Sequence, residues 1–115
     1  MKCSRGDIVL VLFPDSNLRT AKRRPTLVVQ SDNLKAGLSQ TVVAMISSNT
    51  SRAGHPSRVL VSPNSKQGSR SGLKADSVIL TDNLATILDH EMDRVIGSLT
   101  DMESVNAALK HTLAL

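Results

Sequence analysis

Short runs of β-branched and other apolar residues alternate with polar segments containing glycine, proline or serine over the first 80 residues. Apolar runs of this length, bounded by turn residues, predict strands rather than helices. We expect strands at residues 7–13, 26–30, 41–46, 58–61, 77–80 and 93–99, and either a short strand or a turn of helix at residues 84–87.

The spacing of apolar residues changes near the C-terminus. Thr100 is followed three residues later by Glu103, which is the spacing of a capping box. Apolar residues then recur on one helical face at Met102, Val105, Leu109 and Leu113. A terminal helix after several short strands predicts a mainly β (α+β) fold, a small curled antiparallel sheet or barrel, with residues 1–115 as one domain.

The second predicted strand begins at an arginine–proline pair. Proline has no N–H for a sheet ladder, so we expect Pro25 to start the strand and Arg24 to lie just before its N-terminal end. Residues 14–24 are then expected to form a long polar loop. The planar, permanently charged guanidinium of Arg24 is well suited to binding a phosphate. The third strand ends at Ser47, and antiparallel pairing would bring Ser47 to the same sheet edge as Arg24.

Positive charge is concentrated in the first two thirds of the chain. Residues 1–74 hold twelve Lys and Arg against three Asp, a net charge of +9, whereas residues 75–115 have a net charge of −5. Such clustering indicates either a polyanion-binding surface or a solvated basic surface without a partner. Aromatic residues make up only 1 % of the chain, which argues against a surface on which bases stack.

Several other classes of protein are disfavoured. No apolar stretch is long enough to span a membrane and no apolar signal region opens the chain, so we expect a cytoplasmic protein. The single cysteine, Cys3, cannot form an internal disulfide. Residues 89–93 include metal-ligand residue types, but a solvated acidic turn explains them better, and we expect no metal and no cofactor.

An ordered set of motifs resembles the MazF/PemK toxins over essentially the whole chain. These are Arg5-Gly6-Asp7-Ile8-Val9-Leu10-Val11, Arg24-Pro25-Thr26-Leu27-Val28-Val29, Val43-Ala44-Met45-Ile46-Ser47-Ser48, Asp76-Ser77-Val78-Ile79-Leu80 and Ile96-Gly97-Ser98-Leu99. The resemblance implies an SH3-like β-barrel with an added helix and a homodimer. It also implies a metal-independent endoribonuclease that cuts single-stranded RNA and is inhibited by the tail of an antitoxin lying across the active groove.

The resemblance assigns catalytic roles to Arg24 and to Ser47, which occupies the position of a family threonine. Attack by the RNA's own 2′-OH would leave a 2′,3′-cyclic phosphate, with Arg24 stabilising the phosphorane and the proton acceptor unassigned. We expect substrate contacts from Ser48, Asn49, Arg19, Lys22, Arg23, Arg52 and Arg58, and treat His55 as a weaker candidate that is better explained as an exposed loop residue. The alternatives are a nucleic-acid binder without turnover and, less favoured because the chain lacks tryptophan, a gyrase-inhibiting toxin.

Overall fold

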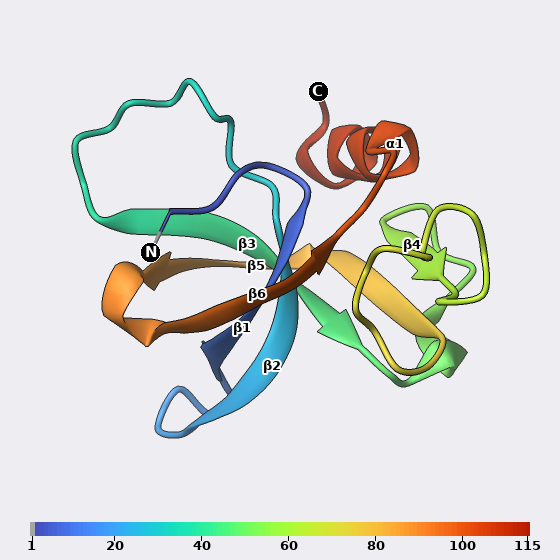
Figure 1. Cartoon of the computed structure of the whole chain (residues 1–115), viewed down its shortest axis with the longest axis horizontal. Helices are drawn as coiled ribbons and strands as arrows, with labels where there is room; N and C mark the ends of the chain where they lie inside the picture. Colours follow the sequence, from blue (N-terminus) through green and yellow to red (C-terminus); the bar gives the residue numbers. More distant parts are fainter. Residues whose placement is uncertain (1) are drawn as a thin grey trace.

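The computed structural model describes residues 2–115, and its order of elements matches the predicted series of strands followed by a helix (Figure 1). The strands are β1 (Asp7–Pro14), β2 (Ala21–Val28), β3 (Gln40–Ser47), β4 (Arg58–Val61), β5 (Ser77–Leu88) and β6 (Met92–Ser98). Two 3-10 turns, η1 (Thr50–Arg52) and η2 (Asp89–Glu91), and the helix α1 (Glu103–Leu113) complete the fold. Within residues 2–115, no helix has the length and apolar character needed to cross a bilayer.

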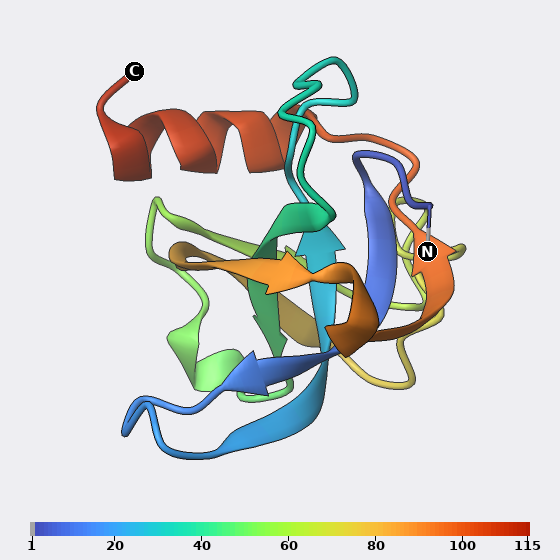
Figure 2. The same ribbon diagram turned by 90° about the vertical axis from the view of Figure 1, so that its left-hand side faces the viewer.

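The six strands form one curled antiparallel sheet in the order β4-β5-β3-β2-β1-β6 (Figure 2). The segment that follows β4 bridges the two edge strands, because the Ser98 N–H on β6 donates to the Arg70 carbonyl at 2.8 Å. A Cβ at Gly97 would overlap the backbone of Ser71, so glycine allows the two backbones to touch. The mainly β prediction is confirmed: the sheet is barrel-like, and the loop after β4 contacts β6 across the gap between the two edge strands.

Two apolar clusters fill the interior. One packs Ile8 and Leu27 of the sheet against Val105 of α1, and the other includes Val9 and Phe13. Consecutive residues of β1 therefore belong to different clusters. Burial on both faces explains why this strand is a nearly continuous apolar run in the sequence.

The helix begins later than predicted. Met102 is the N-cap residue, and the Asp101 carboxylate accepts a hydrogen bond from the Glu103 N–H at 2.9 Å. The prediction of a capping box at Thr100 is therefore wrong. The Leu99 N–H donates to the Gly6 carbonyl at 2.9 Å, which keeps the chain tied to the start of β1 until just before the first helical turn.

The predicted loop at residues 14–24 is also wrong, because β1 and β2 continue as a hairpin as far as the pair Pro14 and Ala21. Pro25 lies inside β2, opposite Leu10 of β1. On its other side β2 pairs with β3 only from Thr26 to Val28, so the proline occupies a stretch with one strand neighbour. A proline is tolerated at such a sheet edge.

Candidate active site

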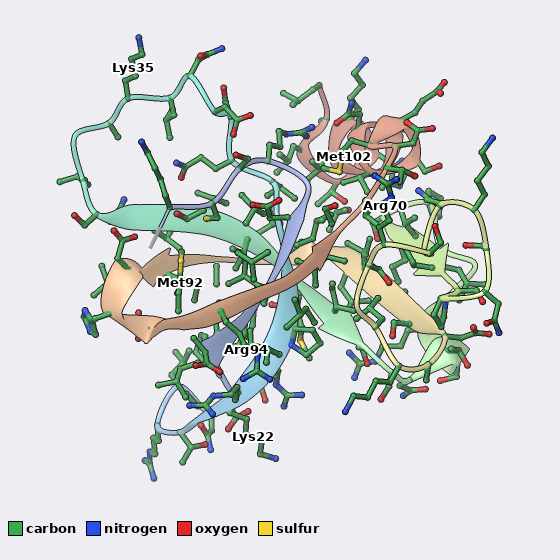
Figure 3. The ribbon with its side chains drawn as sticks, viewed as in Figure 1. Lys22, Lys35, Arg70, Met92, Arg94 and Met102 are labelled. Atoms are coloured by element: carbon green, nitrogen blue, oxygen red, sulfur yellow. The ribbon has the colours of Figure 1, made fainter. Side chains whose placement is uncertain are left out.

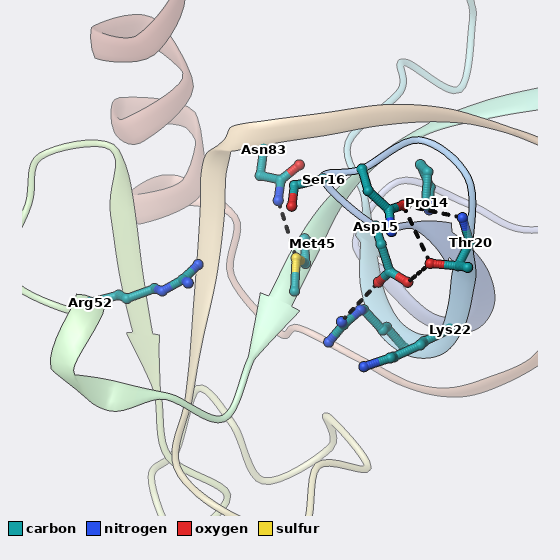
Figure 4. Close-up of a pocket in the computed structure, with 10 residues that line it drawn as sticks. Pro14, Asp15, Ser16, Thr20, Lys22, Met45, Arg52 and Asn83 are labelled. Atoms are coloured by element: carbon teal, nitrogen blue, oxygen red, sulfur yellow. Dashed lines mark hydrogen bonds and ion pairs between the residues drawn. The ribbon is translucent and has the colours of Figure 1, made fainter.

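A polar cavity of about 480 Å³ lies between the β1–β2 turn and the strands β3 and β5 (Figure 4). Its walls carry three cationic side chains, from Lys22 and Arg24 on β2 and from Arg52 on η1. The remaining lining residues are Pro14, Asp15, Ser16, Asn17, Thr20, Met45 and Asn83. A hollow with this excess of positive charge is suited to an anionic ligand.

Strand geometry explains how Arg24 reaches this cavity. Thr26 of β2 pairs with Met45 of β3, and the side chain of Arg24, two residues before Thr26, lies on the same face of the sheet. Because Arg24 belongs to a strand rather than to a free loop, its side chain is attached to a rigid backbone.

A bulge in β5 brings Asn83 to the cavity. Ala44 pairs with Leu84 whereas its neighbour Met45 pairs with Leu80, so residues 81–83 form an insertion relative to β3. Bulges of this kind redirect side chains. Asn83 places its amide nitrogen 3.1 Å from the Met45 sulfur. Residues 84–87, expected as a separate short element, are part of the same long strand.

Asp15 forms an ion pair with Arg24 inside the cavity. Its Oδ1 lies 3.3 Å from Arg24 Nη2, and its Oδ2 accepts a hydrogen bond from the Thr20 hydroxyl at 2.7 Å. The Thr20 hydrogen bond is the main cause that lowers the pKa of Asp15 below 3.8. Partial burial opposes that shift, and Arg24 and Lys22 add to it. Asp15 is thus an anion at neutral pH.

The turn that carries Asp15 is held by its own hydrogen bonds. The Asp15 N–H donates to the Thr20 carbonyl at 2.9 Å, and the Asn17 side-chain oxygen accepts from the N–H groups of Arg19 and Thr20. Leu18 has a φ of 61°, which closes the turn in the left-handed region. Asn17 and Asp15 are typical turn residues, and this was the signal that could have predicted an ordered hairpin here.

Comparison with known proteins identifies the family. Residues 4–113 match the family described as the PemK-like, MazF-like toxin of type II toxin-antitoxin systems. The chain belongs to this family. It is 33 % identical over 114 residues to the endoribonuclease MazF6 of Mycobacterium tuberculosis, covering 89 % of this chain and 100 % of the relative. It is 31 % identical over 118 residues to the endoribonuclease EndoA of Bacillus subtilis, covering 100 % and 97 %.

Solved structures of toxins from this family share the fold. The Mycobacterium tuberculosis toxin MazF-mt6 superposes with a TM-score of 0.74 at 23 % identity, covering 95 % of this chain and 97 % of that one. An endoribonuclease from Mycobacterial species, solved in complex with its cognate antitoxin, gives a TM-score of 0.73 at 22 % identity over 99 % and 97 % of the two chains. The predicted membership of the MazF/PemK toxins is confirmed.

In this toxin the serine-rich end of β3 lies beside the cavity rather than among its lining residues. Continuing the β2–β3 register by two residues aligns Ser47 with Arg24, on the face that Met45 occupies. The Ser47 hydroxyl accepts from the Asn49 N–H at 3.1 Å. The Asn49 side chain caps η1 by accepting from the Ser51 N–H at 3.2 Å. Asn49 thus orients η1, which carries Arg52.

The other predicted contacts divide between the cavity and its surroundings. Lys22 and Arg52 line the cavity, whereas Arg19 and Arg23 are not among its lining residues. Arg23 forms a loose surface pair with Asp93, with 3.8 Å between Nε and Oδ2. Arg58 is bound to Asp82 at 3.0 Å and to the Arg52 carbonyl at 3.2 Å, so it braces the loop that carries Arg52.

His55 belongs to a separate cluster. Its Nδ1 lies 2.7 Å from the Ser57 hydroxyl, and its ring packs edge-to-face on His111 with a centroid distance of 5.9 Å. This packing joins the loop before β4 to the end of α1. No group of three His, Cys, Asp or Glu in residues 2–115 has the arrangement of a metal site.

A second cavity, of about 350 Å³, has a different character. Its walls are largely apolar, with Leu10, Pro25, Leu73 and Ile96, while Lys74 and Arg94 supply cationic groups. Ser48 lines this cavity and not the polar one. Because neighbouring residues of a strand point to opposite faces, Arg24 and Pro25 place the polar and the apolar cavity on the two sides of β2.

Proposed function

We propose that this toxin is an endoribonuclease that cleaves single-stranded RNA at short sequences, in the cytoplasm, by attack of the RNA's own 2′-OH, without a metal ion. One observation carries the proposal: the cations Lys22, Arg24 and Arg52 converge on one polar cavity, with Arg24 fixed on a strand. The relatives named as endoribonucleases support the same reaction class.

The reaction needs a group that stabilises charge as it builds on the phosphorus. Asp15 engages one of the five N–H groups of Arg24, which leaves enough donors for two parallel hydrogen bonds to phosphate oxygens. These bonds strengthen as the phosphorane forms. Ser47 adds a hydroxyl beside the same phosphate, and Lys22 and Arg52 bind neighbouring phosphates, so RNA affinity decreases with salt.

The deciding experiment is incubation of the purified protein with a long single-stranded RNA in EDTA, followed by end-group analysis. We expect discrete fragments with 2′,3′-cyclic phosphate and 5′-OH ends, and loss of cleavage in Arg24→Ala. Arg70→Ala is the matched control, because Arg70 is exposed and lies on the loop after β4 (Figure 3). RNA that is bound but never cut would favour the alternative of a nucleic-acid binder without turnover.

We also propose that the apolar cavity binds the tail of the cognate antitoxin. Leu10, Pro25 and Leu73 would hold an apolar side chain, and Lys74 and Arg94 would pair with acidic residues on either side of it. A tail bound there would continue round β2 onto the polar cavity and exclude RNA. Arg94→Glu should weaken co-purification with the antitoxin while leaving cleavage of RNA intact. If Arg94→Glu and the unchanged toxin co-purify equally well with the antitoxin, this assignment is contradicted.

A homodimer is part of the same proposal, because one shallow groove offers few contacts to an extended RNA. We propose that two copies meet through the region of β3 and α1, where Leu113 is half-exposed at the end of the helix. A two-fold dimer uses the same surface on both copies. Sedimentation that shows only monomer at micromolar concentration would exclude it.

A further inference from the structure

The polar cavity holds a single group that can accept a proton at neutral pH. Lys22, Arg24 and Arg52 are hydrogen-bond donors, and the other polar side chains apart from Asp15 are hydroxyls and amides, which are poor bases. Among the ten lining residues of the described chain, Asp15 is the one carboxylate, and no histidine is present. His55 contacts Ser57 and His111 instead.

The position of Asp15 also fits this task. In RNA the attacking 2′-oxygen is attached to the carbon next to the one that bears the scissile phosphate. A base for that oxygen must therefore lie beside the cation that binds the phosphate. Asp15 Oδ1 lies 3.3 Å from Arg24 Nη2, so a phosphate on the other N–H groups of Arg24 would lie next to this carboxylate.

We propose that Asp15 is the general base of the cleavage reaction, a role that rests on the proposed function. The 2′-O–H proton passes to Oδ1 of Asp15 while the 2′-oxygen forms a bond to phosphorus. The P–O5′ bond then breaks, and the departing 5′-oxygen takes a proton from water at the mouth of the cavity. The products are a 2′,3′-cyclic phosphate, a 5′-OH, a hydroxide ion and a protonated Asp15, and the proton of Asp15 then neutralises the hydroxide to regenerate water and the carboxylate.

The arrangement holds the base in place and tunes it on binding. Thr20 donates its hydroxyl to Oδ2 at 2.7 Å, so Oδ1 can exchange Arg24 for the 2′-OH without moving the carboxylate. In the free protein Thr20 and Arg24 lower the pKa of Asp15. A phosphate on Arg24 withdraws one of these partners and adds a negative charge nearby, and both changes raise that pKa toward the value that an effective base needs.

The test compares Asp15→Asn with the unchanged protein in single-turnover cleavage of one RNA across a range of pH. We expect a rate loss of roughly 10²- to 10⁴-fold at neutral pH. The residual rate of the variant should rise about tenfold per pH unit, because hydroxide must replace the base, whereas the unchanged protein has a plateau. The Asp15→Asn variant should still bind the same RNA carrying 2′-O-methyl groups throughout. This modified RNA cannot be cut by 2′-OH attack.

Two further variants make the test decisive. Asp93→Asn removes the same charge from a loose surface pair and should leave the rate and its pH profile unchanged. Asp15→Glu retains a carboxylate, so its cleavage rate should keep the plateau with pH. This variant also provides the test if Asp15→Asn does not fold. A rate of Asp15→Glu that rises with hydroxide concentration overturns the role.

The remaining outcomes separate this role from the proposed function. Full activity in Asp15→Asn overturns it, and so does a slower rate with an unchanged pH profile, which would make Asp15 a positioning residue for Arg24. In both cases cleavage by the unchanged protein still supports the proposed function. An unchanged protein that binds RNA and never cleaves it overturns both.

Discussion

Arg24→Lys tests whether the shape of the guanidinium or only its charge matters. Arg24 has five N–H donors, of which one contacts Asp15, so two parallel donors remain for a phosphate. A lysine ammonium has three donors around one nitrogen, and these cannot form two parallel bonds to one phosphate as the planar guanidinium does. The variant therefore loses at least one donor to the phosphorane at constant charge.

The loss of one such donor typically lowers the rate about 10²- to 10³-fold, or roughly 3–4 kcal/mol of transition-state stabilisation. The assay is single-turnover cleavage at saturating protein, together with binding of the 2′-O-methyl RNA. Binding should change little, because the charge is retained, while the cleavage rate falls. A lysine variant that cleaves at the original rate would refute the bidentate role and reduce Arg24 to a source of charge.

Two predictions concern the scaffold. Gly97→Ala forces apart the contact between β6 and Ser71 and endangers the Ser98–Arg70 hydrogen bond, so we expect a loss of about 2–4 kcal/mol in urea unfolding. An unchanged midpoint would show that this contact does not stabilise the sheet. For Asp82, burial raises the pKa but the hydrogen bond and charge of Arg58 outweigh it, so its pKa is lowered from 3.8. Its stabilising effect is therefore present above pH 3.8 and is lost as the pH falls through the lowered value. Melting temperatures of Asp82→Asn should depend less on pH in that acid range, and parallel curves would contradict the pairing.

The strands were predictable because each satisfies local rules. The β-branched runs at β1, β3 and β4 lie close to their predicted positions, since burial on one or both faces of a sheet requires such residues there. Arg24 was identified by its place before Pro25. The prediction that Pro25 must start the strand was wrong, because β2 passes through Pro25 at a point where only β1 is its neighbour. Whether a strand has one neighbour or two is decided by the tertiary arrangement.

The remainder of the candidate site depends on contacts between distant residues. Asp15 and Arg24 are nine positions apart, and only the tight turn at Asn17 and Leu18 brings them together. Asn83 reaches the cavity through a register shift between β3 and β5, which no local pattern in β5 announces. Sequence periodicity reports the face of a residue, whereas bulges and turn closure determine which residues converge.

Alternation along β2 separates the two proposed activities of this toxin. Arg24 faces the polar cavity and Pro25 the apolar one, so a single peptide unit separates the proposed RNA site from the proposed antitoxin site. The two sites are nevertheless contiguous, because both include the same strand. An antitoxin that gains affinity from the apolar cavity can therefore block the polar one without mimicking RNA. The division depends on the hairpin register from Pro14 and Ala21 onward, since a slip of one residue would exchange the two faces. The hydrogen bonds that close the Asp15–Thr20 turn fix that register, and they also hold the proposed base.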